Sequence, residues 1–264
     1  MTPYYERGGI TIYCGDCLEI MPGLDGPFDA IIADLPYGTT ACEWDSVIPL
    51  EPLWAEYRRL IKRRGAIVLT ASQPFTTDLI NAARDWFKYE WIWDKRSPVD
   101  FLNVKIKPMS QHEEILIFCG SRPTYNPQYR DDVIKKPQQG VRVNGKQNRV
   151  YGQSNNIRNF GVGYPKTILS FPRPTTNKQH PTQKPVALMS YLIRTYTNPG
   201  ELILDNTMGS GTTLVAAQTE GRRAVGIELS EDYCKIAVER LRQPSFFSIP
   251  ENGNGAKHEQ LELA

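Results

Sequence analysis

A doubly wound, mostly parallel α/β sheet is the fold that this sequence predicts, and three observations support it. Apolar runs typical of buried parallel strands alternate with segments in which apolar residues recur at helical spacing. A chain of 264 residues is long enough for one such α/β domain with an insert. Two of the predicted strands also run into acidic or glycine-rich segments, which is where α/β sheets bind ligands.

Seven strands are predicted. The first is a short apolar run that enters residues 15–16, and the second, residues 28–33, is almost continuously apolar, as a strand buried on both faces must be. The others are bounded by turn residues or by helical segments. In chain order the strands cover residues 10–13, 28–33, 65–70, 89–93, 113–119, 201–204 and 224–227.

Five helices are predicted between these strands. In the first helix, Leu53, Trp54, Tyr57 and Leu60 recur at the spacing of one helical face. The β-then-helix alternation that results is typical of a doubly wound sheet. In chain order the helices cover residues 50–62, 74–87, 185–196, 212–219 and 231–241.

The net charge of +2 is unevenly distributed. Residues 121–180 contain eleven Lys and Arg against Asp131 and Asp132, a balance of +9, which leaves −7 for the other 204 residues. Secondary-structure periodicity fails between 121 and 163, where aromatic residues alternate with polar and basic ones. A basic insert on an acidic body favours a polyanionic partner, and a solvated lysine-rich loop is the alternative. Residues 244–264 are predicted to form a loose tail.

Composition excludes several other classes of protein. No run approaches the ~18 apolar residues of a membrane helix, and the N-terminus does not have the pattern of a secretory signal. Five cysteines without a disulfide framework favour a reducing cytoplasm. Cys14 and Cys17 form a lone C-x-x-C pair away from the three histidines, so two ordinary thiols are favoured over a redox or metal site, and no metal site is predicted.

The first segment with a chemical signature is Asp34-Leu35-Pro36-Tyr37, directly after the strand at 28–33. A carboxylate together with the carbonyl of Leu35 or Pro36 accepts both N–H bonds of an exocyclic amine, which exposes the nitrogen lone pair for attack. Pro36 stiffens the loop, and Tyr37 offers a ring on which a flipped base stacks. An acidic turn that caps a helix is the alternative for such a short motif.

The second segment runs from Leu204 to Thr213 and is followed by a strand that ends in Glu228. A strand, a glycine-rich turn, a helix and an acid-terminated strand are typical of a nucleoside-binding βαβ unit. No lysine follows the second glycine as in a P-loop, and Leu214 stands where a dinucleotide site has a third small residue. The segment favours an adenosine cofactor without pyrophosphate, such as S-adenosylmethionine, over an NAD site.

Taken together, the two segments resemble the β-class amino methyltransferases of DNA, whose catalytic block precedes the cofactor block. The likeness covers nearly all of residues 8–242. Asp34-Leu-Pro-Tyr37 resembles the family's D-P-P-Y, residues 205–211 (D-N-T-M-G-S-G) resemble its D-P-F-x-G-S-G, and residues 180–185 match its H-P-T-Q-K-P. Residues 15–17 and 93–95 also fall where the family has similar residues.

The resemblance implies roles for single residues. Asp16 contacts the adenine of S-adenosylmethionine and Glu228 its ribose, while Lys184 with Thr182 holds the methionine carboxylate. A solvated lysine at a helix start is the other interpretation of Lys184. The loop that binds the cofactor comprises Asp205, Asn206, Met208, Gly209, Ser210, Gly211 and Thr212.

The resemblance also implies an organisation and a reaction. Residues 1–243 form a circularly permuted, Rossmann-like methyltransferase domain around a seven-stranded sheet, and residues 121–165 are an inserted target-recognition region. The expected reaction is direct methyl transfer to N6 of adenine in double-stranded DNA. A homodimer in the cytoplasm of a bacterium, encoded by the bacterium or by a phage, is expected. Whether a cognate restriction endonuclease accompanies the protein stays open.

Two departures from the family pattern leave the chemistry intact. Leu35 replaces the first proline of the catalytic loop, but its carbonyl remains. Around Asn206 and Met208 the proline and the aromatic residue of the family's cofactor loop are absent, but the glycines remain. Cytosine-N4 methylation is the nearest alternative, and the acid at position 34 favours adenine over it. Methylation of RNA or protein, and a non-catalytic DNA-binding protein on the same scaffold, are more distant alternatives.

Overall fold

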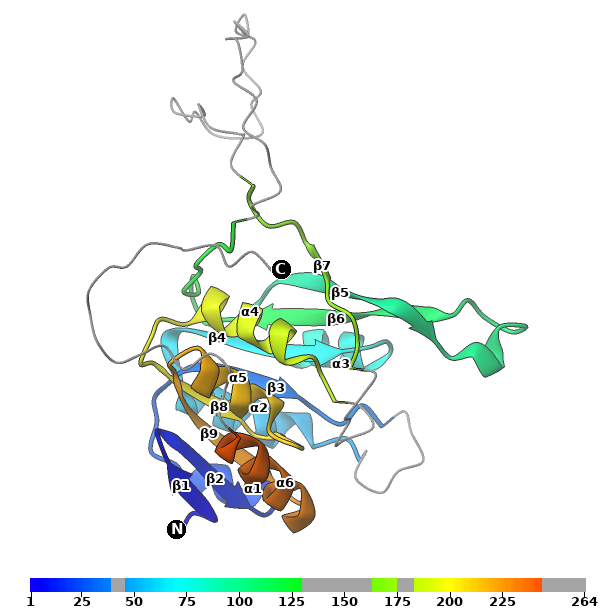
Figure 1. Cartoon of the computed structure of the whole chain (residues 1–264). Helices are drawn as coiled ribbons and strands as arrows, with labels where there is room; N and C mark the ends of the chain where they lie inside the picture. The colour runs from blue at the N-terminus through cyan, green and yellow to red at the C-terminus, as the bar shows by residue number, and fades with distance from the viewer. Residues whose placement is uncertain (39–45, 130–162, 175–182, 244–264) are drawn as a thin grey trace, which may run out of the picture.

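The computed structural model describes residues 1–38, 46–129, 163–174 and 183–243 (Figure 1). Most of the predicted target-recognition region and the whole predicted C-terminal tail lie outside these residues, so the predicted domain division is not tested. No helix among the described residues is long and apolar enough to span a membrane.

A single mixed sheet forms the centre of the described structure, in the order β1-β2-β9-β8-β3-β4-β6-β5-β7. The pairs β2–β9, β9–β8, β8–β3 and β3–β4 are parallel, whereas β6 is antiparallel to both β4 and β5. The strands are β1 (Tyr5–Arg7), β2 (Ile10–Cys14), β3 (Phe28–Asp34), β4 (Ile61–Ala71), β5 (Phe87–Val99), β6 (Ser110–Phe118), β7 (Ile168–Ser170), β8 (Leu202–Asp205) and β9 (Arg223–Glu228).

The predicted fold class is confirmed, but the expected seven strands become nine among the described residues. The two additional strands, β1 and β7, are three residues long and lie at the two edges of the sheet. Strands this short carry almost no periodicity, so their existence depends on the neighbour to which they pair.

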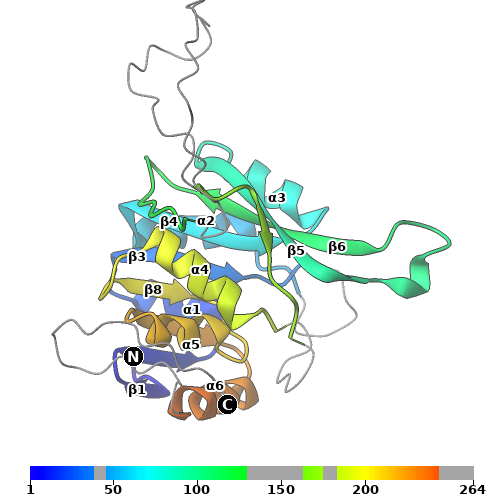
Figure 2. The same cartoon turned by 45° about the horizontal axis from the view of Figure 1, so that its top comes forward.

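Helices cover both faces of the sheet (Figures 1 and 2). Helices α4 (Val186–Tyr196), α5 (Thr212–Thr219) and α6 (Glu231–Arg242) pack on one face. The short α1 (Cys17–Ile20), α2 (Leu50–Leu60) and α3 (Phe75–Ala82) pack on the other. Strand β3 supplies both cores because its side chains alternate: Ala30 and Ile32 face one layer, and Ile31 and Ala33 face the other.

Several predicted boundaries shift by a few residues, and those of α3 and β5 shift most. The helix expected over 74–87 ends at Ala82, because Phe87 pairs with Phe118 in the sheet. Strand β5 begins earlier and ends later than the expected 89–93, because β6 pairs with it as far as Val99. In both places long-range strand pairing overrides local periodicity.

The carboxyl ends of the parallel strands meet at one edge of the sheet. Because β6 is antiparallel to β4 and to β5, strand β5 runs in the same direction as β3 and β4. The amino end of β6 therefore lies at this same edge. Acidic or polar residues concentrate here, which makes this edge the place to search for a ligand site.

Candidate active site

A cleft of about 1230 Å³ opens at the carboxyl edge of the sheet, somewhat larger than the ~300–1,000 Å³ of a typical small-ligand pocket. It is bordered by the segments that follow β2, β3, β8 and β9 and by side chains of β5 and β6. The predicted residues that line it are Asp16, Asp34, Leu35, Pro36, Tyr37, Lys184, Asp205, Asn206, Met208, Gly209, Ser210, Thr212 and Glu228. Gly211 is not among the lining residues, and Thr182 lies outside the described residues.

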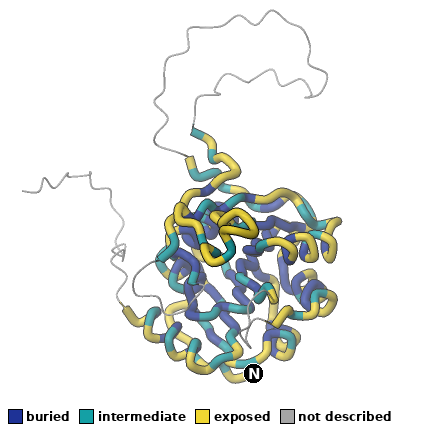
Figure 3. Tube along the Cα trace, turned by 90° about the vertical axis from the view of Figure 1, so that its right-hand side faces the viewer, coloured by how far each residue is buried: buried dark blue, intermediate teal, exposed yellow. Residues whose placement is uncertain are grey.

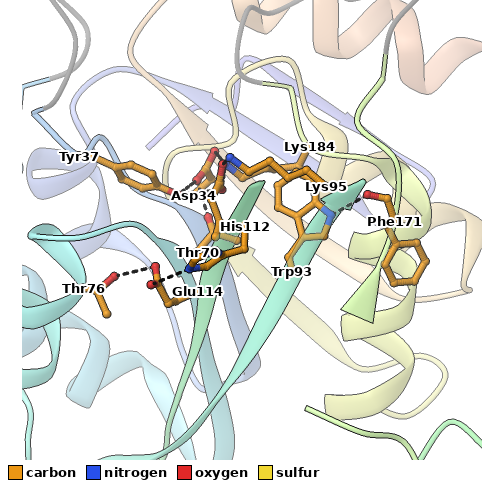
Figure 4. A network of polar contacts seen from close by, with 11 residues as sticks. Asp34, Tyr37, Thr70, Thr76, Trp93, Lys95, His112, Glu114, Phe171 and Lys184 are labelled. Carbon is orange, nitrogen blue, oxygen red and sulfur yellow. Dashed lines mark hydrogen bonds and ion pairs between the residues drawn. The ribbon is translucent and has the colours of Figure 1, made fainter. Parts of the chain in front are cut away.

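Asp34 is the last residue of β3, and its carboxylate is held by three side chains (Figure 4). Oδ1 accepts hydrogen bonds from the hydroxyl groups of Thr70 and of Tyr37, the latter at 2.9 Å. Oδ2 lies 2.9 Å from Nζ of Lys184. Thr70 is the residue of β4 paired directly with Asp34, so the sheet register itself orients the carboxylate.

Lys184 joins Asp34 to a second carboxylate. Its Nζ lies 2.9 Å from Oε2 of Glu113, and Nζ of Lys95 lies 2.7 Å from the other oxygen of Glu113. The Lys95, Glu113 and Lys184 side chains are only 8%, 13% and 7% exposed, so two ammonium groups and two carboxylates balance one another in a nearly dry site. Buried charges are tolerated when they are paired in this way.

The pKa values reflect this pairing. Burial lowers the pKa of Lys184, but the charges of Asp34 and Glu113 raise it more, so its pKa stands above the ordinary lysine value. Burial raises the pKa of Glu113, but Lys184 and Lys95 together lower it below its usual range. Lys184 and Glu113 are therefore both charged at neutral pH.

Tyr37 is fixed from two directions. Its ring stacks on Phe75 of α3, with the centroids 5.6 Å apart, and its hydroxyl group reaches Asp34. Burial, reinforced by the charges of Asp34 and Glu113, raises the pKa of Tyr37 well above its ordinary value. The phenol stays neutral and remains a hydrogen-bond donor to the carboxylate.

The glycine-rich loop after β8 is tied to the acid at the end of β9. Glu228 Oε2 accepts from the Gly209 amide at 2.9 Å, and Oε1 accepts from the Ser230 amide at 2.8 Å. Gly209 has a φ of 52°, and a Cβ added there would meet no atom within 4 Å. The loop therefore borders open space beside an oriented carboxylate.

The segments that follow β3 and β8 touch each other. The Thr207 hydroxyl donates to the backbone oxygen of Asp34 at 3.0 Å. At the base of the loop, Asn206 Oδ1 accepts from the Tyr57 hydroxyl at 2.6 Å, and burial raises the pKa of Asp205 to about 7. Helix α2 and β3 thus position the loop, a link that no local pattern indicated.

Asp16 lies at the rim of the cleft. It is the N-cap of α1, and its Oδ1 accepts from the Leu18 amide at 2.7 Å, while its side chain is exposed. The helix cap and a contact with a ligand are compatible, since a carboxylate has further lone pairs.

The donor set fits an adenosine cofactor. Each oxygen of Glu228 accepts one backbone N–H and keeps lone pairs for ribose hydroxyls. The open space at Gly209 lets a ligand approach the backbone. No group of three or more His, Cys, Asp or Glu side chains forms a metal site within the described ranges. Cys14 and Cys17 are free thiols, one exposed and one buried.

Glu113, Lys95 and Thr70 were missed by the sequence reasoning as site residues. The available signal was an acid at the start of an apolar strand, together with the family-like segment at 93–95. In the structure Glu113 is the residue of β6 paired with Trp93, two positions from Lys95 on β5. Strand pairing therefore brings both residues to the cleft.

A model of a protein family described as DNA methylase matches residues 28–239 of the chain. The DNA adenine methyltransferase YhdJ of Escherichia coli (strain K12) is 28% identical over 263 residues, 91% of this chain and 85% of the relative. The crystal structure of the M1.HpyAVI–SAM complex superimposes with a TM-score of 0.61 and 26% identity, and the match covers 88% of this chain and 100% of the other. The PvuII cytosine-N4-specific DNA methyltransferase has a TM-score of 0.65 at 16% identity over 92% and 90% of the two chains, a likeness of fold alone.

Proposed function

This chain belongs to the DNA methylase family, and we propose that it methylates N6 of adenine in double-stranded DNA at a specific site. The family match spans most of the chain, and the expected resemblance to DNA amino methyltransferases is confirmed by it. Transfer of a methyl group from S-adenosylmethionine to an exocyclic amine of DNA is the activity of the family. The choice of base and the roles of single residues are the proposal.

The observation that carries the proposal is the state of the Asp34 carboxylate. Among the described residues, Oδ1 accepts two hydrogen bonds and Oδ2 one, so one lone pair of Oδ2 is left. That lone pair is placed to accept an N–H of the target amine. The carbonyl of Leu35 or Pro36 accepts the other N–H, so the nitrogen lone pair is directed at the methyl group.

Positioning and electrostatics account for the catalysis. Thr70, Tyr37 and Lys184 hold Asp34 in place before substrate arrives, so no reorganisation is needed at the moment of reaction. Bound S-adenosylmethionine supplies an electrophilic methyl group on a positively charged sulfur. Asp34 Oδ2 is placed to take the proton that the methylated amine gives up.

The cofactor is held by residues of the glycine-rich loop and by the strand ends beside it. Glu228 is proposed to accept the ribose hydroxyls, and Asp16, at the rim, to contact the adenine. Lys184 with Thr182 is proposed to hold the methionine carboxylate. In the structure Lys184 is already bonded to Asp34 and Glu113, so this contact would use the remaining N–H of its ammonium group.

Adenine is favoured over cytosine by two observations. Position 34 carries an acid, whereas the cytosine-N4 enzymes of the family more often have serine there. YhdJ, which matches 91% of this chain, is named as an adenine methyltransferase. Cytosine-N4 methylation is the second candidate, because the PvuII enzyme has the same fold.

Product identification tests this proposal. The protein is incubated with methyl-labelled S-adenosylmethionine and unmethylated genomic DNA, which is then digested to nucleosides and analysed by mass spectrometry. Asp34→Ala is compared with Asp25→Ala, which removes an exposed carboxylate before the opposite end of β3. Methyladenine that disappears only in the Asp34 variant supports the proposal. Methylcytosine overturns the choice of base, and no methylated base overturns the function.

We also propose a homodimer, by analogy with the family, and sedimentation as a monomer at micromolar concentration contradicts it. Because the proposed substrate is DNA, we also propose that the protein acts in the cytoplasm of a bacterium, where it is encoded by the bacterium or by a phage. A cognate restriction endonuclease would cleave the site that this protein methylates, so mapping that site comes before a search for one.

A further inference from the structure

An arm extends from the sheet beside the cleft (Figures 1 and 2). The arm comprises residues 96–109. It extends beyond the paired residues Asp94 and His112, and its tip contains the 3₁₀ helix η2 (Phe101–Asn103). Because β5 runs parallel to β3 and β4, the arm projects from the carboxyl edge, where the cleft opens. It is therefore on the side from which a substrate approaches.

The tip of the arm exposes large apolar side chains. Phe101 is 71% exposed, Leu102 82% and Ile106 84%. Val104 and Met109 are about half exposed, so five of the fourteen exposed large hydrophobic residues among the described part of the chain fall within nine positions. In Figure 3, which views the molecule from the side of the arm, the tube in front is coloured mostly as exposed. Such a concentration of exposed apolar side chains is typical of a surface that binds a partner molecule.

The arm is continuous with the active site and is basic. Val99, Asp100, Asn103 and Lys107 of the arm line the same cleft as Asp34. Arg96, Lys105 and Lys107 outnumber Asp100, which is paired with Lys107 at 2.5 Å, so the arm carries a net charge of +2. Apolar side chains between cations suit a partner with an anionic backbone and a stacked apolar interior.

Double-stranded DNA has this chemistry. A base inside the duplex cannot reach Asp34 unless it leaves the stack, and that movement opens a gap between its neighbours. Proteins that open DNA insert Phe, Leu, Ile or Met side chains between base steps. The arm presents side chains of these types at the rim of the cleft that must receive the base.

We propose that the arm is a strand-opening wedge: Phe101 and Leu102 enter the base stack beside the target nucleotide, and Lys105 contacts a flanking phosphate. The wedge rests on the proposed function, because it needs DNA as the substrate. The wedge stabilises the duplex with the target base outside the stack, so its contribution is confined to substrates in which that base begins paired and stacked.

The test uses Phe101→Ser combined with Leu102→Ser. Both side chains are mostly exposed, so folding is expected to be unchanged, and Tyr4→Ser is the matched control, an exposed aromatic residue near the opposite edge of the sheet. Two oligonucleotide duplexes carry the methylation site mapped from genomic DNA. One is fully paired, and the other has an abasic residue opposite the target base, which is then already unpaired.

On the paired duplex the double variant is expected to lose about tenfold or more in rate, because opening one step costs a few kcal/mol. On the abasic duplex the loss is expected to be severalfold smaller, because an unpaired base leaves the stack at a lower cost. The Tyr4 variant should match the unsubstituted protein on both. Lys105→Ala should weaken binding to both duplexes and reduce the dependence of affinity on salt.

Four results overturn the wedge. An equal loss on the two duplexes makes the arm an ordinary DNA contact, and no loss removes it from the reaction. A loss that accompanies a change in sedimentation makes the tip a contact between copies of this chain. If the unsubstituted protein methylates no DNA, the proposed function fails and the wedge with it, whereas normal methylation with unaffected variants overturns the wedge alone.

Discussion

Glu113→Gln tests whether the buried charges beside Asp34 act as one network. The substitution keeps the shape of the side chain and one oxygen but removes its charge. Glu113 contacts Lys95 at 2.7 Å and Lys184 at 2.9 Å, and all three side chains are at most 13% exposed. In the variant, Lys184 would keep the Asp34 carboxylate as its partner, whereas Lys95 would lose the carboxylate with which it pairs among the described residues.

The expected cost follows from these contacts. Removing one partner of a buried ion pair destabilises a protein by about 3–5 kcal/mol. Lys184 retains Asp34, and the glutamine oxygen still accepts from one ammonium group, so we expect the lower end, about 3 kcal/mol of unfolding free energy. For a chain of this size the melting temperature should fall by about 2–4 °C for each kcal/mol.

The cost should also depend on pH. The pKa of Glu113 is lower in the folded protein than in the unfolded chain, so the charged side chain stabilises the fold above its unfolded pKa of about 4.3. This stabilisation is lost as pH falls through the folded pKa. A glutamine at position 113 does not titrate, so it contributes no such dependence of stability on pH. The difference between the two proteins should therefore be full at pH 7 and should shrink below about pH 4.3.

Urea unfolding followed by tryptophan fluorescence, at neutral and acidic pH, measures both effects. Glu114→Gln is the matched control, because Glu114 is the next residue of β6 and, within the described part of the chain, its carboxylate meets only the Thr76 hydroxyl at 3.2 Å and the His112 ring at 3.7 Å. Because glutamine can still accept from the Thr76 hydroxyl, we expect this control to cost about 1 kcal/mol or less. A Glu113 variant as stable as the Glu114 variant at pH 7, or a difference that does not shrink in acid, would refute the network.

Three further predictions concern the cofactor loop and its supports. Gly211→Ala should destabilise the protein more than Gly200→Ala. Both glycines have φ near 78°, a conformation that costs alanine about 1–2 kcal/mol. Of these two positions, only at 211 would the new Cβ also clash, because it would lie 2.8 Å from the Cβ of Ala237. Thermal unfolding of the two variants checks this, and equal losses would contradict it. Glu228→Gln should weaken cofactor binding by about 10–100-fold, the worth of a hydrogen bond to a charged acceptor, when measured by isothermal titration calorimetry; unchanged affinity would remove Glu228 from the ribose site. Asp205→Asn should gain stability relative to the unsubstituted protein as pH rises towards 8, because a pKa raised to about 7 means that ionisation of the buried Asp205 opposes folding above its unfolded value. Urea unfolding at pH 5 and pH 8 measures this gain, and a constant difference between the two would speak against it.

Local patterns in the sequence predicted much of the parallel sheet and much of the candidate site. Strand β3 is apolar at nearly every position because both its faces are covered, and that covering is a property of a parallel sheet between two helical layers. Asp34 and Glu228 end their strands, and Asp205 ends β8, so their place in the sequence alone put them at the carboxyl edge.

Long-range pairing decided the rest. Glu113 lines the cleft only because β6 runs antiparallel to β4 and β5, which puts its amino end where those strands have their carboxyl ends. Lys184 faces Asp34 through a chain separation of 150 residues, and the arm exists because β5 and β6 stay together beyond the edge of the sheet. The periodicity of a sequence follows which face of a helix or strand is buried, so it determined the helices and strands and the chemical groups at their ends. The direction and register of pairing depend on contacts between distant segments, so only the tertiary structure determined which charges meet.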